Sequence, residues 1–376
     1  MDVEIVLFFL LGLCNNSGYV IMNAGAKTIA PSYVGVIYLC NVLPSFSMKA
    51  TLPYWYKLAS YKLRLRSATV FMACSFLLVG AGQLSSTLGL QFLGIALGSL
   101  QGGLGEATFL ALSSKFDVDS RRKIITAWSS GTGLAGLFGY GWVFLFEGVM
   151  GARFSSTCFA SLIIPVIFAV CFETALKKAE EDRDVAFEPL QQQVEESEGV
   201  EQPQQQQSTV RRVAALWPYM VPLMSVYFFE YALQSGVWAA IGFPITEKKA
   251  RDNFYEAANS VYQVGVLLSR SAGTLLHFKY HALALLPFLQ GILFTLFWLD
   301  AIWMWVYSYV LLLFCLLVGL IGGSIYVGMF ALLSEEKEAE FKLTATSLAD
   351  SVGIILANIV GIYIQHSIYS FHKIHD

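Results

Sequence analysis

The sequence predicts an all-α membrane protein with about 11 transmembrane helices, arranged as two bundles joined by a linker. Three observations lead to this expectation. The chain of 376 residues is 56% hydrophobic and only 14% charged, with a mean hydropathy of +0.59, which lies outside the range of ordinary soluble domains. Its apolar residues gather in runs long enough to cross a bilayer. One acidic, glutamine-rich segment divides these runs into two groups.

About 20 consecutive apolar residues cross the hydrocarbon core of a bilayer. Eleven runs of about this length follow one another along the chain. The first run, in MDVEIVLFFLLGL, has no basic residue ahead of it, so we interpret it as a span rather than a removable signal peptide. The tenth run is longer than a bilayer requires, and we expect it to kink or to extend beyond the lipid. The expected spans are residues 4–25, 32–55, 67–86, 88–114, 124–147, 155–175, 215–243, 254–275, 280–299, 302–334 and 343–368.

The segment between the sixth and seventh runs, residues 177–212, is rich in Glu and Gln and poor in aromatic residues. Such a segment cannot bury enough apolar surface to fold, so it is expected to be disordered. Lys and Arg gather in the connections that share its side, which predicts that the linker and the N-terminus are cytoplasmic. We therefore divide the chain into an N-terminal six-helix bundle (1–176), a disordered cytoplasmic linker (177–214) and a C-terminal bundle of about five helices (215–376).

An internal repeat relates the two groups of runs. GGLGEATFLALSS at 102–114 is similar to GGSIYVGMFALLS at 322–334, and TAWSSGTG at 126–133 is similar to TATSLADS at 344–351. Two halves repeated in parallel around a long linker are typical of transporters whose halves are related by an axis along the membrane normal. The repeat predicts a major-facilitator-like fold without the twelfth span. Chance similarity between glycine-rich helices is the alternative.

Glycines in the fourth and fifth runs are expected to serve helix packing. The letters GTGLAG match the G-x-G-x-x-G of a dinucleotide-binding loop, but they lie inside an apolar run with no strand before them. We instead interpret Gly131, Gly133 and Gly136, with Gly102 and Gly103 in the fourth run, as positions where neighbouring helices approach closely.

Several classes of function lack their signatures in this sequence. The six cysteines show no C-x-x-C spacing and the five histidines no H-E-x-x-H, so we expect no metal and no cofactor. A net charge of −3 without a basic face argues against nucleic acid as a partner. No P-loop motif is present, which argues against an ATP-driven pump. No nucleophile with a base and an orienting group appears, so the chain is not expected to be an enzyme.

Ionisable residues inside spans are costly and are therefore candidates for function. Glu230 lies about half way along its run, where a carboxyl group could carry a proton across the membrane. It could instead form an ion pair with Arg270 or Lys49, or a hydrogen bond to the neighbours of Tyr231 or Gln234 on another helix. The planar fork of Arg270 would suit a phosphate or carboxylate, although an arginine near the end of a span can also extend to the membrane surface. The candidates for a substrate or proton pathway are Glu230, Arg270, Glu106, Asp350 and Lys49, together with Asn15 and Asn16, whose amides could instead form hydrogen bonds between helices.

Five segments spread over both halves carry a family resemblance: FLLGLCNN (9–16), GLGEATFLAL (103–112), WSSGTGLAGL (128–137), VPLMSVYFFEY (221–231) and YQVGVLLSRS (262–271). In these segments the chain resembles the battenin family, lysosomal and vacuolar membrane proteins named for Batten disease. The resemblance implies a major-facilitator-like fold and residence in a late endosomal, lysosomal or vacuolar membrane. It also implies a role in organelle pH and basic amino acid balance, and export of glycerophosphodiesters.

Two features depart from the family pattern. The C-terminal sequence HKIHD contains no cysteine, so the prenylation of animal members is not carried over. The linker sequence EEDRDVAFEPLQQ resembles the acidic dileucine sorting region of the family, but Leu190 is followed by Gln191.

The preferred interpretation is a lysosomal or endosomal membrane transporter. It would move a small polar metabolite by alternating access, coupled to protons through Glu230, and contribute to lysosomal pH homeostasis. The alternative is a non-transporting scaffold or regulator that binds trafficking proteins through residues 177–212. A water-lined cavity joining the buried charges would favour transport, whereas charges sealed in pairs would favour the scaffold.

Overall fold

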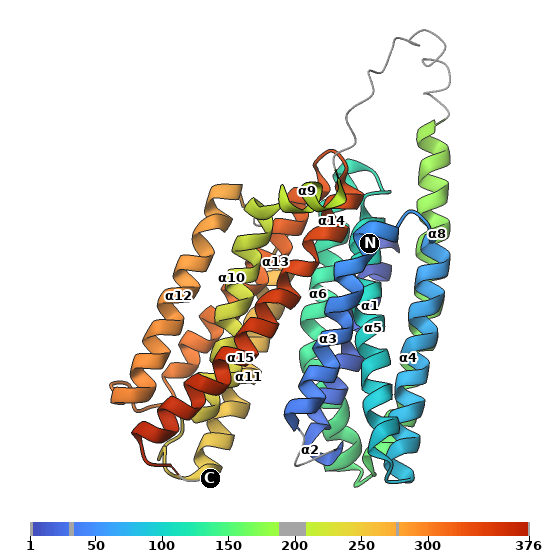
Figure 1. Cartoon of the computed structure of the whole chain (residues 1–376). Coiled ribbons are helices and arrows are strands. Elements are labelled where there is room, and N and C mark those ends of the chain that lie inside the picture. The colour runs from blue at the N-terminus through green and yellow to red at the C-terminus, as the bar shows by residue number, and fades with distance from the viewer. Residues whose placement is uncertain (1–2, 30–33, 188–207, 276–277, 375–376) are drawn as a thin grey trace.

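The computed structural model describes residues 3–29, 34–187, 208–275 and 278–374, and within these ranges it contains helices and no strand. The helices form two bundles that stand side by side (Figure 1). The N-terminus lies at the end of the bundles from which the linker leaves, and the C-terminus lies at the opposite end (Figure 1). We call these the linker side and the far side.

The described part of the first bundle contains six long helices and two short ones, α2 and α7. Its elements are α1 (Val3–Ala24), α2 (Ala26–Ile29), α3 (Val34–Trp55), α4 (Tyr61–Leu84), α5 (Leu88–Ser113), α6 (Val118–Val143) with a π-helical continuation at Phe144–Val149, α7 (Phe154–Ala160) and α8 (Ile163–Phe187).

The described part of the second bundle contains five long helices and two short ones, α9 and α14. Its elements are α9 (Thr209–Ala214), α10 (Trp217–Ala232) with π-helical and 3-10 continuations at Leu233–Val237 and Trp238–Ala240, α11 (Lys248–Ser271), α12 (Tyr280–Trp303), α13 (Leu311–Ser334), α14 (Ala339–Thr346) and α15 (Leu348–Phe371).

The two bundles repeat one packing pattern. In the first, α1 packs on α6 and α3 packs on α5; in the second, α10 packs on α15 and α11 packs on α13. The α3–α5 and α11–α13 crossings match. A Cβ atom built at Gly103 of α5 would lie 2.8 Å from the Ser45 carbonyl oxygen of α3. A Cβ atom built at Gly323 of α13 would lie 2.8 Å from the Val266 carbonyl oxygen of α11. The internal repeat seen in the sequence is therefore a repeat of structure.

Eight helical segments in the described ranges are long and apolar enough to cross a membrane. The other three expected spans correspond to α3, α10 and α11, which are helical but less apolar or interrupted. Helix α3 carries Asn41 and Lys49, α10 is followed by a π-helical turn, and α11 begins with the polar sequence KKARDN. Helix α3 contacts α15 and α11 contacts α6. Lys49 of α3 meets Asp350 of α15 between the bundles, whereas Asn41 is hydrogen-bonded to Asn23 of α1 within the first bundle.

Two expectations about individual segments were wrong. The run at 302–334 is no single kinked helix, because α12 ends at Trp303 and α13 begins at Leu311. Asp300 explains the break: its carboxylate accepts a 2.6 Å hydrogen bond from the Val306 backbone N–H, which holds the chain in a turn. The linker expected to be disordered over 177–214 is helical at both ends, in α8 and α9, and residues 188–207 lie outside the described ranges.

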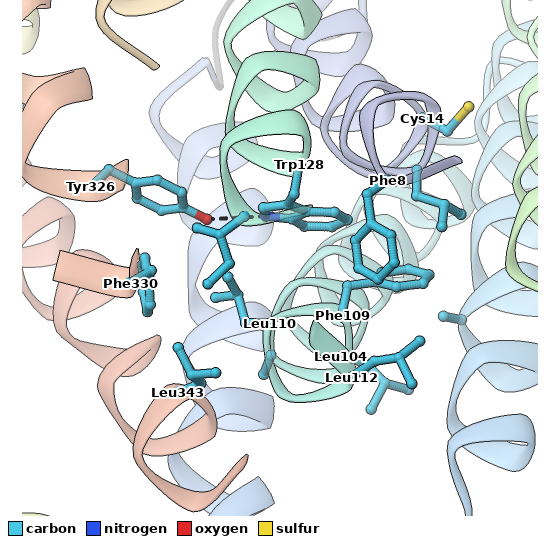
Figure 2. Packing of buried hydrophobic residues seen from close by; sticks show 14 of the residues in the cluster. Phe8, Cys14, Leu104, Phe109, Leu110, Leu112, Trp128, Tyr326, Phe330 and Leu343 are labelled. Carbon is cyan, nitrogen blue, oxygen red and sulfur yellow. Dashed lines mark hydrogen bonds between the residues drawn. The ribbon is translucent and has the colours of Figure 1, made fainter. Parts of the chain in front are cut away.

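An aromatic core supports the interface between the bundles. The rings of Phe109 and Trp128 are 5.2 Å apart, and Phe8 meets Phe109 edge-on with centroids 6.1 Å apart. Figure 2 shows this cluster continuing across the interface to Tyr326 and Phe330 of α13. Such packing fixes the rotamers of side chains that lie next to the buried charges.

Candidate functional site

A buried cluster of three charges joins the two bundles. Lys49 on α3 is 2% exposed, and its Nζ lies 2.5 Å from Glu106 Oε2 on α5 and 3.0 Å from both carboxylate oxygens of Asp350 on α15. Asp350 also accepts hydrogen bonds from the backbone N–H and the hydroxyl of Ser351, at 2.5 and 3.0 Å. With both carboxyl groups ionised, the cluster would carry a net charge of −1.

Tyr326 extends this cluster from the second bundle. Its hydroxyl donates a 2.6 Å hydrogen bond to Glu106 Oε1, and the Trp128 indole N–H donates to the same hydroxyl at 3.3 Å (Figure 2). The carboxylate of Glu106 is thus held by a cation of its own bundle and by a phenol of the other. This arrangement satisfies the rule that buried charges are paired and hydrogen-bonded.

Arg270 on α11 reaches across the interface rather than extending to the membrane surface. Its Nη1 donates to Thr132 Oγ1 on α6 at 2.6 Å, and its Nη2 donates to the Tyr227 hydroxyl on α10 at 2.9 Å. The guanidinium carbon lies 4.2 Å from the centre of the Tyr326 ring, in a cation–π contact. Its Nε is buried without a hydrogen-bond partner in the described ranges. Every polar partner of Arg270 described here is a hydroxyl group.

Glu230 on α10 is 2% exposed. Its Oε1 accepts a hydrogen bond from the Tyr262 hydroxyl on α11, and its Oε2 has no hydrogen-bond partner among the described residues. A Cβ atom built at Gly322 would lie 2.0 Å from Oε2, so this glycine makes room for the carboxyl group. The expected alternative of an ion pair with Arg270 or Lys49 is not found among the described ion pairs.

Asn15 connects α1 to α5. Its Oδ1 accepts a hydrogen bond from Gln101 Nε2 at 2.8 Å, and its Nδ2 donates to the Gly102 carbonyl at 3.3 Å and to Asn16 Oδ1 at 3.2 Å. Asn15 thus acts in the structure as a bond between helices, and Asn16 supports it.

The glycines expected to serve packing divide into two groups. A Cβ atom at Gly131 would lie 2.0 Å from the Phe9 carbonyl oxygen of α1, so this position lets α6 and α1 meet. Cβ atoms at Gly133 and Gly136 would meet Leu267 Cα at 3.2 Å and Gln263 Oε1 at 2.4 Å, both on α11 of the other bundle. Gly102 was misjudged, because a side chain there would meet nothing within 4 Å.

The internal repeat relates the two cations. Gly103 meets Ser45 of α3, and the matching Gly323 meets Val266 of α11. Lys49 follows Ser45 by four residues as Arg270 follows Val266, so the two cations correspond. The repeated sequence segments place Glu106 at the position of Tyr326. Each bundle therefore presents one cation at equivalent places, but Lys49 meets two carboxylates and Arg270 meets a ring and hydroxyl groups. The half-site around Arg270 has the polarity that suits an anion.

Charged contacts close the linker side between the bundles. Lys115, in the turn after α5, lies 2.6 Å from Glu340 on α14, and Arg122 on α6 lies 2.9 Å from Glu335, which follows α13. Arg121 donates a 3.0 Å hydrogen bond to the Ser334 carbonyl. These contacts hold the linker-side ends of the bundles together.

Comparison with protein families matches a model described as CLN3 protein over residues 6–214 and 180–371. Protein btn1 of Aspergillus fumigatus is 31% identical over 405 residues, covering 96% of this chain and 87% of that protein. Protein BTN1 of Saccharomyces cerevisiae is 30% identical over 404 residues, covering 98% of this chain and 95% of that protein.

Solved structures of transporters share the fold. The E. coli fucose:proton symporter FucP superposes with a TM-score of 0.57 at 13% identity, covering 99% of this chain and 97% of FucP. A bacterial homologue of the iron transporter ferroportin in an outward-facing state gives 0.62 at 15% identity, with coverages of 99% and 96%. The human organic anion transporter MFSD10 gives 0.62 at 13% identity, with coverages of 98% and 94%. The expected major-facilitator-like fold is confirmed.

Proposed function

The chain belongs to the CLN3 protein family, and from this premise we propose that it carries a small polar solute across a lysosomal or vacuolar membrane by alternating access. It is a multi-pass membrane protein with a transporter-like fold. The observation that supports transport best is the charge cluster of Lys49, Glu106 and Asp350. It is one buried network of three charges that both bundles share.

Alternating access requires contacts between the bundles that can form and break. The bundles meet at the linker side through Lys115–Glu340 and Arg122–Glu335. Opening that side separates these pairs, and the two partners of each pair can be hydrated once apart, because all four side chains are partly exposed. Separating these two pairs costs little, since exposed ion pairs contribute about 0–1 kcal/mol each.

Arg270 is the proposed partner of an anionic group on the solute. Its guanidinium already uses two N–H groups on hydroxyls, which a phosphate or carboxylate could replace or join through charge-assisted hydrogen bonds. A glycerophosphodiester carries such a phosphate, and a basic amino acid carries a carboxylate. Both classes are implied by the family resemblance, and both share the anionic group that Arg270 would bind.

Protons are the proposed coupling ion. Protonation of Asp350 would remove the carboxylate that reaches Lys49 from the other bundle and weaken the junction between the bundles. Glu230, with one oxygen unpartnered, is a second place where a proton could reside. Coupling at either site would link transport to the pH of the organelle.

Uptake into proteoliposomes tests the proposal. A labelled glycerophosphodiester and, in parallel, labelled arginine are offered at matched pH and with a pH gradient, to wild type, Arg270→Gln and Glu230→Gln. Arg66→Gln is the matched control, since it removes an arginine from the exposed pair with Glu173. We expect saturable uptake that is lost in Arg270→Gln, uncoupled from the gradient in Glu230→Gln and retained in the control. Uptake no faster than in empty liposomes for both solutes would favour the scaffold, with partners bound to residues 177–212.

A further inference from the structure

One position that is filled in the first bundle is open in the second. Helix α8 packs against α1 and α4. The repeat makes α10 the counterpart of α1 and α12 the counterpart of α4, because α1–α6 and α10–α15 pack alike and the elements follow in the same order. The counterpart of the place of α8 is therefore the space along α10 and α12.

A groove with a volume of about 810 Å³ occupies this space, and its lining comes from α10 and α12 alone. Its lining includes bulky residues such as Phe229 and Phe288. Between them lie small side chains and prolines, which leave room for another helix. Those on α10 are Pro218, Pro222 and Ser225, and those on α12 are Ala284, Pro287 and Gly291. In Figure 1, α12 stands at the outer edge of its bundle as α8 does in the other.

The groove is held in shape by the chain itself. Pro222 has no N–H to donate to the carbonyl of Pro218, four residues earlier in α10. The Tyr280 hydroxyl at the start of α12 donates a 3.0 Å hydrogen bond to that carbonyl instead. Rings of Tyr219 and Tyr280 meet edge-on nearby, with centroids 5.6 Å apart. These contacts tie α10 to α12 at the linker side, so the groove is preformed.

The outer face of α12 is an apolar ridge beside the groove. Only 22% of the residues across its most apolar stretch are buried, against 61% for α13. Phe288 is 70% exposed and Ile292 is 56% exposed, and both also line the groove. One helix thus supplies a wall of the groove and the most open apolar ridge. A ridge and a groove on one surface are what a twofold, self-complementary interface needs.

We propose that two copies of this chain form a dimer in the membrane, with α12 of each copy seated in the groove between α10 and α12 of the other. The twofold axis would run along the membrane normal, so both copies keep the same orientation. Each partner helix would take the place that α8 takes in the first bundle. Burial of Phe288 and Ile292 against the partner would replace lipid contacts by close helix packing.

Disulfide crosslinking in native membranes tests the interface. In a background where the partly exposed Cys40 and Cys74 are alanine, Phe288→Cys is compared with Val170→Cys, which is 63% exposed on α8 of the other bundle. We expect a crosslinked dimer for Phe288→Cys and none for Val170→Cys under the same mild oxidation. Equal crosslinking at both positions, or at neither, would overturn the proposal.

Filling the groove provides an independent readout. Single-molecule photobleaching of full-length labelled protein in lipid nanodiscs should show two bleaching steps for wild type and for Val170→Leu, and one step for Gly291→Leu. The three atoms nearest to a Cβ built at Gly291 all belong to the Phe229 ring, at 3.3–3.9 Å, so the variant is expected to fold. A single bleaching step for wild type would overturn the proposed dimer. The groove would then be covered by lipid or by a helix of another protein.

Discussion

Lys49 is the residue on which the central junction depends. It is the cation of the cluster, and it faces two carboxylates from different bundles. Removing one member of a buried ion cluster costs more than the cluster contributes, because the remaining charges lose their compensation. The effect of a substitution at Lys49 therefore reports how far the cluster is shielded from water.

Lys49→Met is expected to lower the free energy of unfolding by about 3–5 kcal/mol, since it leaves Glu106 and Asp350 without their shared cation. Thermal unfolding of the purified protein measures the loss. The double variant Lys49→Met with Asp350→Asn removes one of the two uncompensated carboxylates, so it should be more stable than the single variant. A single variant as stable as wild type, or a double variant less stable than the single one, would contradict this view.

Arg270→Lys should impair binding of an anionic solute although it keeps the positive charge. A lysine ammonium lacks the planar fork that reaches Thr132 and Tyr227 at once. Loss of one charge-assisted hydrogen bond costs about 1.5–3 kcal/mol, which corresponds to a rise of about tenfold or more in the KM for uptake. Uptake kinetics at fixed pH provide the measurement, with Arg66→Lys as control. Unchanged KM in Arg270→Lys would show that the fork is not used.

Sequence reasoning found the charges of the site and missed its neutral members. Lys49, Glu106 and Asp350 stand out because ionisable groups in lipid are costly. Tyr326 and Thr132 carry no such signal, since hydroxyl groups are common in spans. Only the repeat, which places Tyr326 at the position of Glu106, could have pointed to one of them. The distances between helices that make these residues one site depend on packing that no local pattern contains.

At the scale of elements, α14 acts as a latch between the bundles. Glu340 on α14 accepts a 2.7 Å hydrogen bond from Tyr61 and pairs with Lys115, both of the first bundle. Phe341 on the same helix is buried beside Tyr56. A reagent on the linker side reaches position 341 only when the bundles separate there.

Glu340→Gln is expected to favour opening of the linker side. In a Phe341→Cys background, the rate of labelling by a membrane-impermeant thiol reagent should rise several-fold, since loss of about 1 kcal/mol shifts the equilibrium by about fivefold. Glu173→Gln is the matched control, because it breaks the pair with Arg66 within the first bundle. Equal labelling rates in both variants would mean that the latch does not hold the bundles.

The connection between α13 and α14 contains a contact that depends on pH. Burial alone would raise the pKa of Glu336, but hydrogen bonds from Lys342 and Tyr219 outweigh it, so the pKa lies below its ordinary value. A carboxyl group with a lowered pKa in the folded protein stabilises it at pH values above the ordinary pKa of about 4.3. That stabilisation is lost as the pH falls through the lowered pKa.

Lys342→Met should therefore lower the melting temperature at pH 7 and have less effect as the pH falls below about 4. The side chains of Lys342 and Glu336 are partly exposed, which limits the effect at pH 7 to about 1 kcal/mol. Lys248→Met, which breaks an exposed pair with Asp252, is the control and should shift the melting temperature less. A Lys342→Met effect that grows with acidity would contradict the assignment.

Hydropathy marks α3 and α11 less strongly than most of the other expected spans. The spans expected at 32–55 and 254–275 appear as α3 and α11, which lie at the interface and carry polar residues that lower their hydropathy. The run at 302–334 misled for the opposite reason, since its aromatic residues at 303–309 are apolar on average but form a turn held by Asp300. The composition of a segment gives its average hydropathy, but tertiary contacts determine whether the segment packs against lipid or against another helix.

At the scale of the whole molecule, the repeat builds two similar halves with different electrostatics. The first bundle contributes Lys49 and Glu106, and the second contributes Arg270, Glu230 and Asp350. Only Asp350 crosses the interface to complete the ion cluster of the other half. The junction therefore combines an ion cluster at Lys49 with cation–π and hydroxyl contacts at Arg270, and Tyr326 takes part in both.

This division predicts that the halves recognise each other without a covalent connection. The contacts between them come from α3, α5 and α6 on one side and α11, α13, α14 and α15 on the other, all outside residues 188–207. Co-expressed chains 1–187 and 208–376 should therefore copurify from detergent. Lys49→Met in the first chain should reduce the yield of the pair. Glu106 and Asp350 would then be buried without a cation, and separating the halves would let water reach them. Arg66→Gln should not reduce the yield. Halves that never copurify would mean that the linker, rather than the buried network, holds the bundles together.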